Sequence, residues 1–413
     1  MVPKGWKKTH LKCVISGAIK NGYSPLPAST NTGYWVLSLG ALTDHGINSL
    51  EIKPVVVDEK VKQALLSHGD FLISRSNTPD KVGRSIRFKN EVQNCSYPDL
   101  MMRFCVDATK ADPDFIEIKL KSTGVRQYYK SCAAGSSSSM VKINKAVVEN
   151  TPLLLPPFPE QRIIAKILST WDQAISTTEQ LLANSQQQKK ALMQQLLTGK
   201  KRLLDKNGVR FSGEWKAQRI GSLLKEVKRP VQWDDDSEYH LLSVKRRSEG
   251  VVLREILKGS DILTKKMNTA LAGDFLISKM QVVHGATGLV TEEFNKCHIS
   301  DSYIALRPKD DEKIDIAFFS WFSKQKIMYH KAFLCSYGVH IEKMTFNFNM
   351  FIKEKVVIPA SLEEQKKIST ILSTAEQEIS ALQKKLSALK QEKQALMQQL
   401  LTGKRRVKVE AAA

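Results

Sequence analysis

The strongest constraint on this chain is a repeat whose period is half of its length. Three segments occur twice, each pair offset by the same 204 residues: GDFLIS at 69–74 and 273–278, ILST at 167–170 and 371–374, and ALMQQLLTGK at 191–200 and 395–404. Three matches in one register indicate a duplication. Because 413 residues are enough for two domains of ordinary size, the sequence predicts two domain-sized copies and not a solenoid of short repeats.

Each copy has the same internal order. A mixed segment rich in Gly, Pro, aromatic and β-branched residues comes first, with strands expected at Gly69–Ser74 and Ser300–Leu306. A proline-bearing hinge at 153–159 or 356–361 then leads into a long helix. Pro159 and Ser361 suit the helix starts, and a glycine follows each helix end, where a left-handed residue is needed. The order predicts an α+β fold with two mixed domains separated by two long helices.

The second helix carries a heptad seam. Its seam positions alternate four and three residues apart, as in a coiled-coil stripe: Ala375, Ile379, Leu382, Leu386, Leu389, Lys393, Leu396 and Leu400. The stripe of the first helix is weakened by polar residues at Thr178, Ser185 and Lys189, but Leu181 and Met193 are expected to widen it. A helix of about 40 residues is ~60 Å long, too long to lie inside a small domain.

The simplest arrangement packs the two helices on each other and holds the mixed domains apart. If the helices run antiparallel, the duplicated chain acquires an approximate two-fold axis, which suits a protein that contacts two separated DNA half-sites. A coiled coil made only for oligomerisation is the alternative.

The charge points to a polyanionic partner. The chain has 63 Lys and Arg against 42 Asp and Glu, a net charge of +21, and nucleic acid is the commonest partner of so basic a protein. The alternative is a charge that only keeps the protein soluble. The longest apolar runs are too short to span a bilayer, and the start has no apolar signal core, so we expect a cytoplasmic protein. Six widely spaced cysteines without a CxxC pair favour reduced thiols over disulfides or a zinc site.

Catalytic motifs are incomplete. Leu155-Pro156-Pro157-Phe158 resembles the NPPF motif of adenine methyltransferases, but the essential Asn is Leu and no Gly-rich loop follows a strand. Pro98-Asp99 with Glu117-Ile118-Lys119 satisfies a loose nuclease pattern that has no clear equivalent in the second copy. The Ser-rich stretch 135–140 lacks the Gly-Lys-Ser/Thr ending of a phosphate loop, and the histidines lack metal-ligand spacing. The sequence therefore predicts no active site and no metal site.

The same features resemble the specificity subunit of type I restriction–modification systems. The cues are the helix starts Pro159-Glu160-Gln161 and Glu364-Gln365, the twin QQLLTGK ends, the twin GDFLIS strands, and the openings around Trp6 and Trp215. The resemblance covers essentially the whole chain. It departs at the second hinge, where Pro359 stands alone against three prolines in the first copy.

The resemblance implies a function and a set of partners. In that family two target recognition domains each read half of a bipartite DNA sequence, and the helices set the unread spacer and dock two methyltransferase subunits. S-adenosylmethionine, Mg²⁺ and ATP then belong to the modification and restriction subunits, and this chain needs no cofactor. On this basis we expect recognition domains at 1–158 and 211–360, helices at 159–200 and 361–404, a linker at 201–210, and a tail at 405–413 whose last residues could come from a vector.

Base readout requires Arg or Lys for guanine and Asn or Gln for adenine, whereas phosphate contacts require only positive charge or hydroxyls. The polar loops after the two GDFLIS strands are the first candidates: Arg75, Ser76, Asn77 and Thr78 in one copy, and Lys279, Gln281 and His284 in the other. The second candidates lie late in each domain: Ser136, Ser137, Ser138 and Lys142, and Tyr337, His340, Lys343 and Asn347. The expected phosphate contacts are Arg84, Arg87, Lys245, Arg246 and Arg247.

Three function classes are distinguishable. A specificity subunit predicts sequence-dependent DNA binding without turnover. A self-contained nuclease or methyltransferase predicts activity with Mg²⁺ or S-adenosylmethionine, and the incomplete motifs argue against it. A coiled-coil scaffold predicts no salt-dependent DNA affinity, and the net charge of +21 argues against it.

Overall fold

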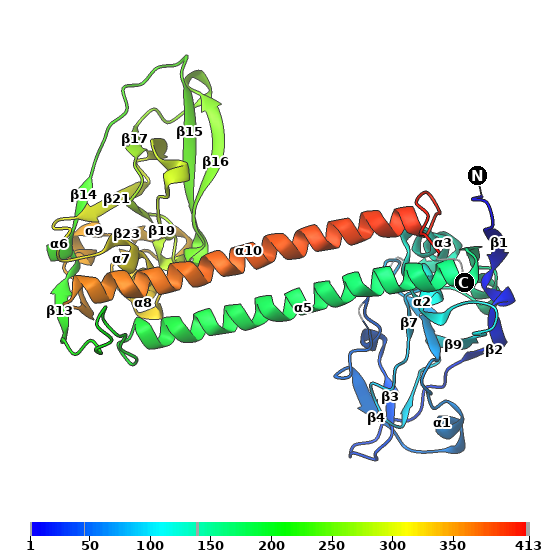
Figure 1. Cartoon of the computed structure of the whole chain (residues 1–413). Helices are drawn as coiled ribbons and strands as arrows, with labels where there is room; N and C mark the ends of the chain where they lie inside the picture. The colour runs from blue at the N-terminus through cyan, green and yellow to red at the C-terminus, as the bar shows by residue number, and fades with distance from the viewer. Residues whose placement is uncertain (1, 45, 138–139, 410–413) are drawn as a thin grey trace. The chain divides into compact units, whose positions relative to one another are not determined.

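The computed structural model describes residues 2–44, 46–137 and 140–409. Its described residues divide into two compact units. Unit 1 comprises Met1–Glu179 together with Lys384–Ala413, and unit 2 comprises Gln180–Gln383. Each unit therefore contains a mixed domain, the first part of the helix that follows it, and the last part of the other long helix. Both units combine helices with sheets, so the predicted α+β class is confirmed (Figure 1).

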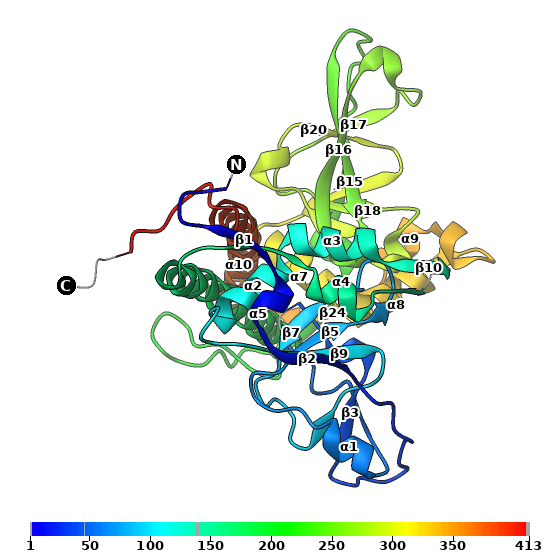
Figure 2. The ribbon, with the colours of Figure 1, turned by 90° about the vertical axis from the view of Figure 1, so that its right-hand side faces the viewer.

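Unit 1 is built on a four-stranded antiparallel sheet in the order β2-β9-β5-β7. Helices α2 and α3 lie at one end of this sheet, and α1 with β3 and β4 lies at the other (Figures 1 and 2). The elements up to the first long helix are β1 (Lys7–His10), β2 (Ile15–Asn21), β3 (Trp35–Leu37), β4 (Ile52–Pro54), α1 (Glu59–Gln63), β5 (Phe71–Ser74), β6 (Ser76–Asn77), β7 (Ser85–Arg87), β8 (Cys95–Ser96), β9 (Met101–Val106), α2 (Pro113–Lys121), α3 (Thr123–Cys132), β10 (Ala134–Ser137), β11 (Met140–Lys142), α4 (Lys145–Glu149), β12 (Pro152–Leu155) and α5 (Phe158–Leu196).

Unit 2 repeats this plan with a sheet in the order β14-β21-β18-β19. Its elements are β13 (Trp215–Arg219), α6 (Ile220–Leu223), β14 (Leu224–Val227), β15 (Glu238–Lys245), η3 (Arg246–Ser248), β16 (Gly250–Lys258), β17 (Met267–Ala270), β18 (Phe275–Ser278), η5 (Val282–His284), β19 (Thr287–Leu289), β20 (Cys297–Ser300), β21 (Tyr303–Pro308), α7 (Ile316–Ser323), α8 (Lys326–Leu334), β22 (Ser336–Tyr337), η7 (Ile341–Lys343), β23 (Thr345–Phe346), α9 (Phe348–Phe351), β24 (Lys355–Pro359) and α10 (Leu362–Leu400). The strand expected at Ser300–Leu306 is wrong as one element, because β20 ends at Ser300 and β21 begins at Tyr303.

The repeated GDFLIS segment is a tight turn followed by the central strand of each sheet. The turn glycines have positive φ, 93° at Gly69 and 85° at Gly273, where a side chain would be strained. The next residue is a buried carboxylate that accepts from a backbone N–H of the turn and binds an arginine, Asp70 with Arg103 and Asp274 with Arg307. The repeat is therefore preserved by backbone geometry and a buried ion pair.

The two copies differ in their second sheets. Unit 1 carries a three-stranded sheet, β4-β3-β8, where unit 2 carries a four-stranded sheet, β16-β15-β20-β17, built on a long hairpin. By contrast, a short hairpin follows the second helix after the main sheet in both units, β10–β11 after α3 and β22–β23 after α8. The late candidate loops of the two copies thus occupy equivalent places in the topology, as the sequence predicts.

The ends of the long helices complete the cores. Leu400 and Leu401 are buried with Trp6 and Leu153 in the core of unit 1, and Leu196 and Leu197 occupy the same role in unit 2. Gly199 and Gly403 both have φ of 70°, which confirms the expected left-handed helix ends. The ALMQQLLTGK repeat, at the end of each long helix, therefore completes the hydrophobic core of the other copy's mixed domain.

An arginine after each helix end adds a charged contact. Arg406 donates to both carboxylate oxygens of buried Glu160, and Arg202 does the same to Glu364. Arg406 in the expected tail at 405–413 and Arg202 in the expected linker at 201–210 therefore each bind a buried glutamate near the start of a long helix.

The two long helices pair in antiparallel fashion within each unit. In unit 1, Lys393 lies 2.5 Å from Asp172 and Lys390 lies 2.6 Å from Glu179, so α10 and α5 advance in opposite directions. In unit 2, Lys189 pairs with Glu376, and Ser185 lies 3.4 Å from Glu378. Two of the three polar residues expected to weaken the α5 stripe, Ser185 and Lys189, therefore bind carboxylates on α10, whereas Thr178 donates to the Ala174 carbonyl of its own helix.

The burial of residues along α10 follows the heptad seam predicted from the sequence. Each seam position is buried or half-buried, whereas the residues between Ser380 and Ala395 that lie off the seam are exposed. Met193 packs against the unit 2 core as expected. The expectation for Leu181 is wrong, because 49% of this side chain is exposed and it lies off the seam.

Candidate nucleic-acid interface

Three loops of unit 2 bring charged residues from distant segments together. The loops are η3 between β15 and β16, η5 after β18, and η7 within the β22–β23 hairpin. Arg246 Nη2 donates to Glu342 Oε2 at 2.6 Å, and Arg246 Nε donates to Gln281 Oε1. Three of the predicted residues, Arg246, Gln281 and His284, therefore lie around Glu342.

His284 lies beside the same carboxylate. Its Nε2 is 3.2 Å from Glu342 Oε1, but this nitrogen has no aligned hydrogen-bond partner. Sequence reasoning missed Glu342, because a lone glutamate in a loop carries no motif. The sequence hints at it only in that Glu342 stands between His340 and Lys343, two of the candidate DNA contacts.

The η3 turn is held in an unusual backbone conformation. Arg247 and Ser248 have φ of 58° and 55°, a region that non-glycine residues rarely adopt. Ser248 N donates to Gly285 O at 2.8 Å, and Ser248 Oγ lies 2.6 Å from the Tyr329 hydroxyl. These contacts fix the turn so that Lys245, Arg246 and Arg247 are exposed. The three cations therefore remain candidates for DNA contacts.

Other predicted residues of unit 2 have different surroundings. Tyr337 and His340 are exposed in the β22–β23 hairpin, and Lys343 belongs to η7. Lys279 Nζ donates to the Asp301 carbonyl at 2.6 Å, and Asn347 Oδ1 accepts from Met350 N at 3.1 Å to cap α9. Lys279 and Asn347 therefore make contacts within the fold in this structure, and their expected role in base contact stays a prediction.

In unit 1, the loop after β5 is less exposed than expected. Ser76 and Asn77 form β6 and pair with β11, with side chains 0% and 8% exposed. Both residues are therefore buried in this structure, and their expected contact with DNA stays a prediction. Arg75 donates weakly to the Asp99 carbonyl at 3.4 Å, while Thr78 is exposed.

The late hairpin of unit 1 is the more accessible candidate. Lys142 is exposed on β11, and Ser136 and Ser137 belong to the facing strand β10. Ser138 lies outside the described residues. The hairpin joins β6 in one three-stranded sheet, so the two candidate segments of this domain do meet.

Arg84 and Arg87 both have partners within unit 1. Arg84 donates to the Leu42 carbonyl at 3.0 Å and to Asp44 at 3.1 Å. Arg87 pairs with Asp114 and with Glu117, and only 15% of its side chain is exposed. Internal carboxylates bind both guanidinium groups in this structure, which gives both residues a role in the fold, and their expected phosphate contacts stay a prediction.

Comparison with known proteins identifies the family. The family model described as the type I restriction modification DNA specificity domain matches residues 59–184 and 213–391, which is more than half of the chain. The chain belongs to this family.

Relatives and solved structures agree with this assignment. A protein assigned as the MjaX type I restriction enzyme specificity subunit of Methanocaldococcus jannaschii is 24% identical, covering 98% of this chain and 95% of the relative. The EcoKI specificity subunit of Escherichia coli is 26% identical over 46% of this chain and 41% of its own length. A type I S subunit from M. genitalium has the same fold, with a TM-score of 0.62, 14% identity and 96% of each chain covered. The protein is therefore a non-catalytic specificity subunit, as the sequence predicts.

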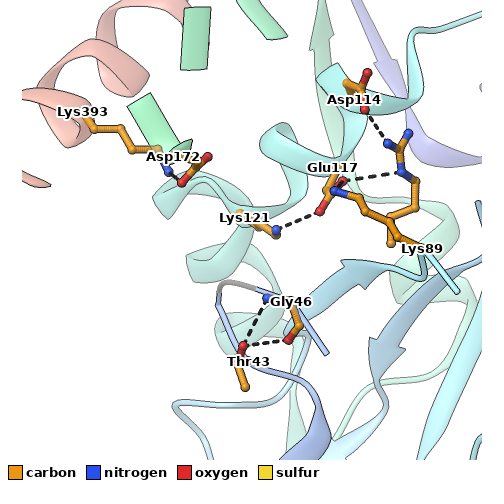
Figure 3. Close-up of polar contacts among 9 residues, drawn as sticks. Thr43, Gly46, Lys89, Asp114, Glu117, Lys121, Asp172 and Lys393 are labelled. Carbon is orange, nitrogen blue, oxygen red and sulfur yellow. Dashed lines mark hydrogen bonds and ion pairs between the residues drawn. The ribbon is translucent and has the colours of Figure 1, made fainter. Parts of the chain in front are cut away.

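The nuclease-like residues of this specificity subunit are used for folding. Figure 3 shows Glu117 between Lys121 and Lys89, whose Nζ atoms lie 2.9 and 3.4 Å from its carboxylate oxygens. Burial raises the pKa of Glu117, but Lys121, Lys89 and Arg87 outweigh it, so the pKa lies below its usual value. Asp99 binds Ser24 elsewhere, so the two carboxylates of the loose pattern have different partners.

Lys119, the last residue of that pattern, caps the end of α10. Its Nζ donates to the Leu401 carbonyl at 2.8 Å, and burial lowers its pKa to about 8. Within residues 2–44, 46–137 and 140–409, no group of three or more His, Cys, Asp or Glu side chains is placed to hold a metal. Over the same residues, no helix is both long and apolar enough to cross a membrane.

Proposed function

We propose that this specificity subunit reads a bipartite DNA target, one half-site by each mixed domain, across a spacer that is not read. The proposed recognition domains are residues 1–158 and 211–360. The proposal rests on the duplication: the two domains share their main sheet topology, whereas the loops that follow equivalent strands and helices carry different side chains. Common scaffolds with divergent polar loops suit two readers of different half-sites.

The candidate contacts divide into two classes. In the second domain, Gln281 and His284 are candidates for base edges, with Tyr337 and His340 in the late hairpin. Arg246, expected from the sequence to contact phosphate, joins them because Gln281 and Glu342 orient its guanidinium group, and Lys245 and Arg247 remain candidates for phosphates. In the first domain, the hairpin around Lys142 and the segment of Arg75 and Thr78 serve these roles. Ser76 and Asn77 then shape the loop from beneath it, because they are buried in β6.

The long helices are proposed as the spacer and as the docking surface for two adenine methyltransferase subunits. Leu181, whose exposed side chain has no place in the heptad seam, is one residue that such a partner could cover. S-adenosylmethionine, Mg²⁺ and ATP would be bound by the modification and restriction subunits. The expected cytoplasmic location fits a protein that acts on genomic DNA.

The test is single-molecule sequencing of genomic DNA from cells that express this chain with its neighbouring methyltransferase. The proposal predicts methylated adenine in two short half-sites around a fixed spacer. Exchange of residues 1–158 for those of a homologue should then change one half-site and leave the other unchanged. A single continuous motif, or no methylation, would contradict the two-reader proposal. In that case, salt-dependent binding of the isolated chain distinguishes a DNA reader from a scaffold.

A further inference from the structure

Glu342 is an exposed carboxylate next to a cluster of cations, and Glu249 at the end of η3 is a second one. Lys245 at the end of β15 and Arg246 and Arg247 in η3 are exposed, and the Glu342 side chain from η7, paired with Arg246, is 55% exposed. A carboxylate at this place repels the phosphates of DNA and lowers sequence-independent affinity. For DNA binding, this cost is offset where the carboxylate favours one DNA sequence over others.

The contacts of Glu342 place it next to the best base-reading candidate of unit 2. Its two oxygens face Arg246 Nη2 at 2.6 Å and His284 Nε2 at 3.2 Å. The Arg246 side chain is 47% exposed, so solvent and DNA can reach it. Gln281 accepts from Arg246 Nε on the other side, which orients the guanidinium plane beside the carboxylate.

This pair matches the major-groove edge of one base pair. Guanine presents two acceptors, N7 and O6, and its partner cytosine presents the N4 amino donor beside them. An arginine beside a glutamate presents the complementary order, donors followed by an acceptor. No other base pair shows that order, because adenine, thymine and a reversed pair place an acceptor or a methyl group opposite one of the two side chains.

Resting on the proposed function, we propose that Glu342 is a specificity-determining residue that reads cytosine. Arg246 donates to guanine O6 and N7, and Glu342 accepts from the N4 amino group of the paired cytosine. Exposed ion pairs contribute little binding energy, so Arg246 can exchange its bond to Glu342 for bonds to guanine. The freed carboxylate then requires a new donor, which the cytosine N4 amino group supplies. Adenine opposite thymine also presents an amino group there, but thymine places its methyl group where Arg246 would meet guanine N7. Cytosine or adenine on the Arg246 side leaves Glu342 facing guanine O6 or thymine O4, both acceptors, and this penalty adds to the lost arginine contact.

The experiment selects bound sequences from a library of randomised DNA duplexes with the full chain and sequences the bound fraction. The variants are E342A, E342Q and R246A. Matched controls are E255A and R254A, because Arg254 and Glu255 form an exposed ion pair on β16 of the same unit, away from η3, η5 and η7. Thermal unfolding checks that each variant is folded.

The wild-type motif should contain a C·G pair in one half-site. E342A and R246A should both reduce the preference for that pair, by about 5- to 150-fold, and leave the other half-site unchanged. E342Q should admit adenine in place of cytosine, because an amide can donate and accept with adenine N7 and N6. The controls should keep the wild-type motif.

The outcomes separate the two proposals. If the wild-type chain enriches no motif with two half-sites, the proposed function fails. If it enriches one but E342A leaves every position unchanged, or weakens all sequences equally, Glu342 only holds Arg246 and the inference is overturned. A motif without a C·G pair at the position altered by R246A also overturns it.

Discussion

The glutamine at the start of each long helix joins the helix to its mixed domain. Gln161, 3% exposed, accepts from Asp112 N at 2.9 Å and donates to the Pro156 carbonyl at 2.9 Å. The first contact reaches the N-cap of α2, and the second reaches the hinge before α5. Gln365 makes the equivalent contacts with Asp315 N and the Pro359 carbonyl. We therefore predict that Gln161→Met destabilises unit 1 without a comparable effect on unit 2.

The expected magnitude follows from the two backbone groups that lose a partner. A buried polar group without a partner costs about 1–3 kcal/mol. Methionine fills nearly the same volume, so no cavity is added. Because Gln161 lines a surface pocket, water can replace part of the lost bonding, and we expect a net loss of ~2–4 kcal/mol. This corresponds to local opening that is about 30- to 700-fold more frequent.

Hydrogen–deuterium exchange of the full chain measures this opening. Peptides from β1 and β12 should exchange faster in Gln161→Met, while peptides from β13 and β24 keep their wild-type rates. Gln365→Met should give the opposite pattern. Lys166→Met is the matched control, since Lys166 is exposed on the same helix. Equal exchange of β1 and β12 in Gln161→Met and Lys166→Met would refute the role assigned to the glutamine.

Three further predictions concern the core, the charge and the DNA surface. Ile379→Ala, in the buried seam, should cost about 2–4 kcal/mol of unfolding free energy, whereas Ser380→Ala should be neutral; urea unfolding measures both. Burial lowers the pKa of Lys119 in the folded chain to about 8 from the ordinary 10.5, so the unfolded chain binds more protons between these two pH values. The free energy of unfolding should therefore rise with pH across this window, and the rise should disappear in Lys119→Met. An unchanged rise in that variant would contradict the prediction. Arg247→Ala should reduce the salt dependence of DNA binding by about one phosphate contact, whereas Arg87→Ala should lower stability and leave that dependence unchanged.

The candidate site was only partly predictable. Arg246, Gln281 and His284 were expected from residue type, and the structure brings them together. Glu342, which contacts Arg246 and His284, was missed, because it lies 96 residues from Arg246 and no local pattern links the two. Arg84 and Arg87 were assigned to phosphate because composition cannot distinguish a free arginine from one whose partners come from other elements.

The sequence by itself determined the features that depend on near neighbours along the chain. The 204-residue repeat, the helix starts within one residue of Pro159 and Ser361, the glycine ends, and the heptad seam of α10 all follow from spacing, since helix periodicity and capping are local properties. Tertiary structure alone decided which polar residues face solvent. Ser76 and Asn77 became buried because β11 pairs with β6, and Leu181 remained exposed because the seam passes beside it. Burial depends on contacts between distant segments, and those contacts exist only once the chain is folded.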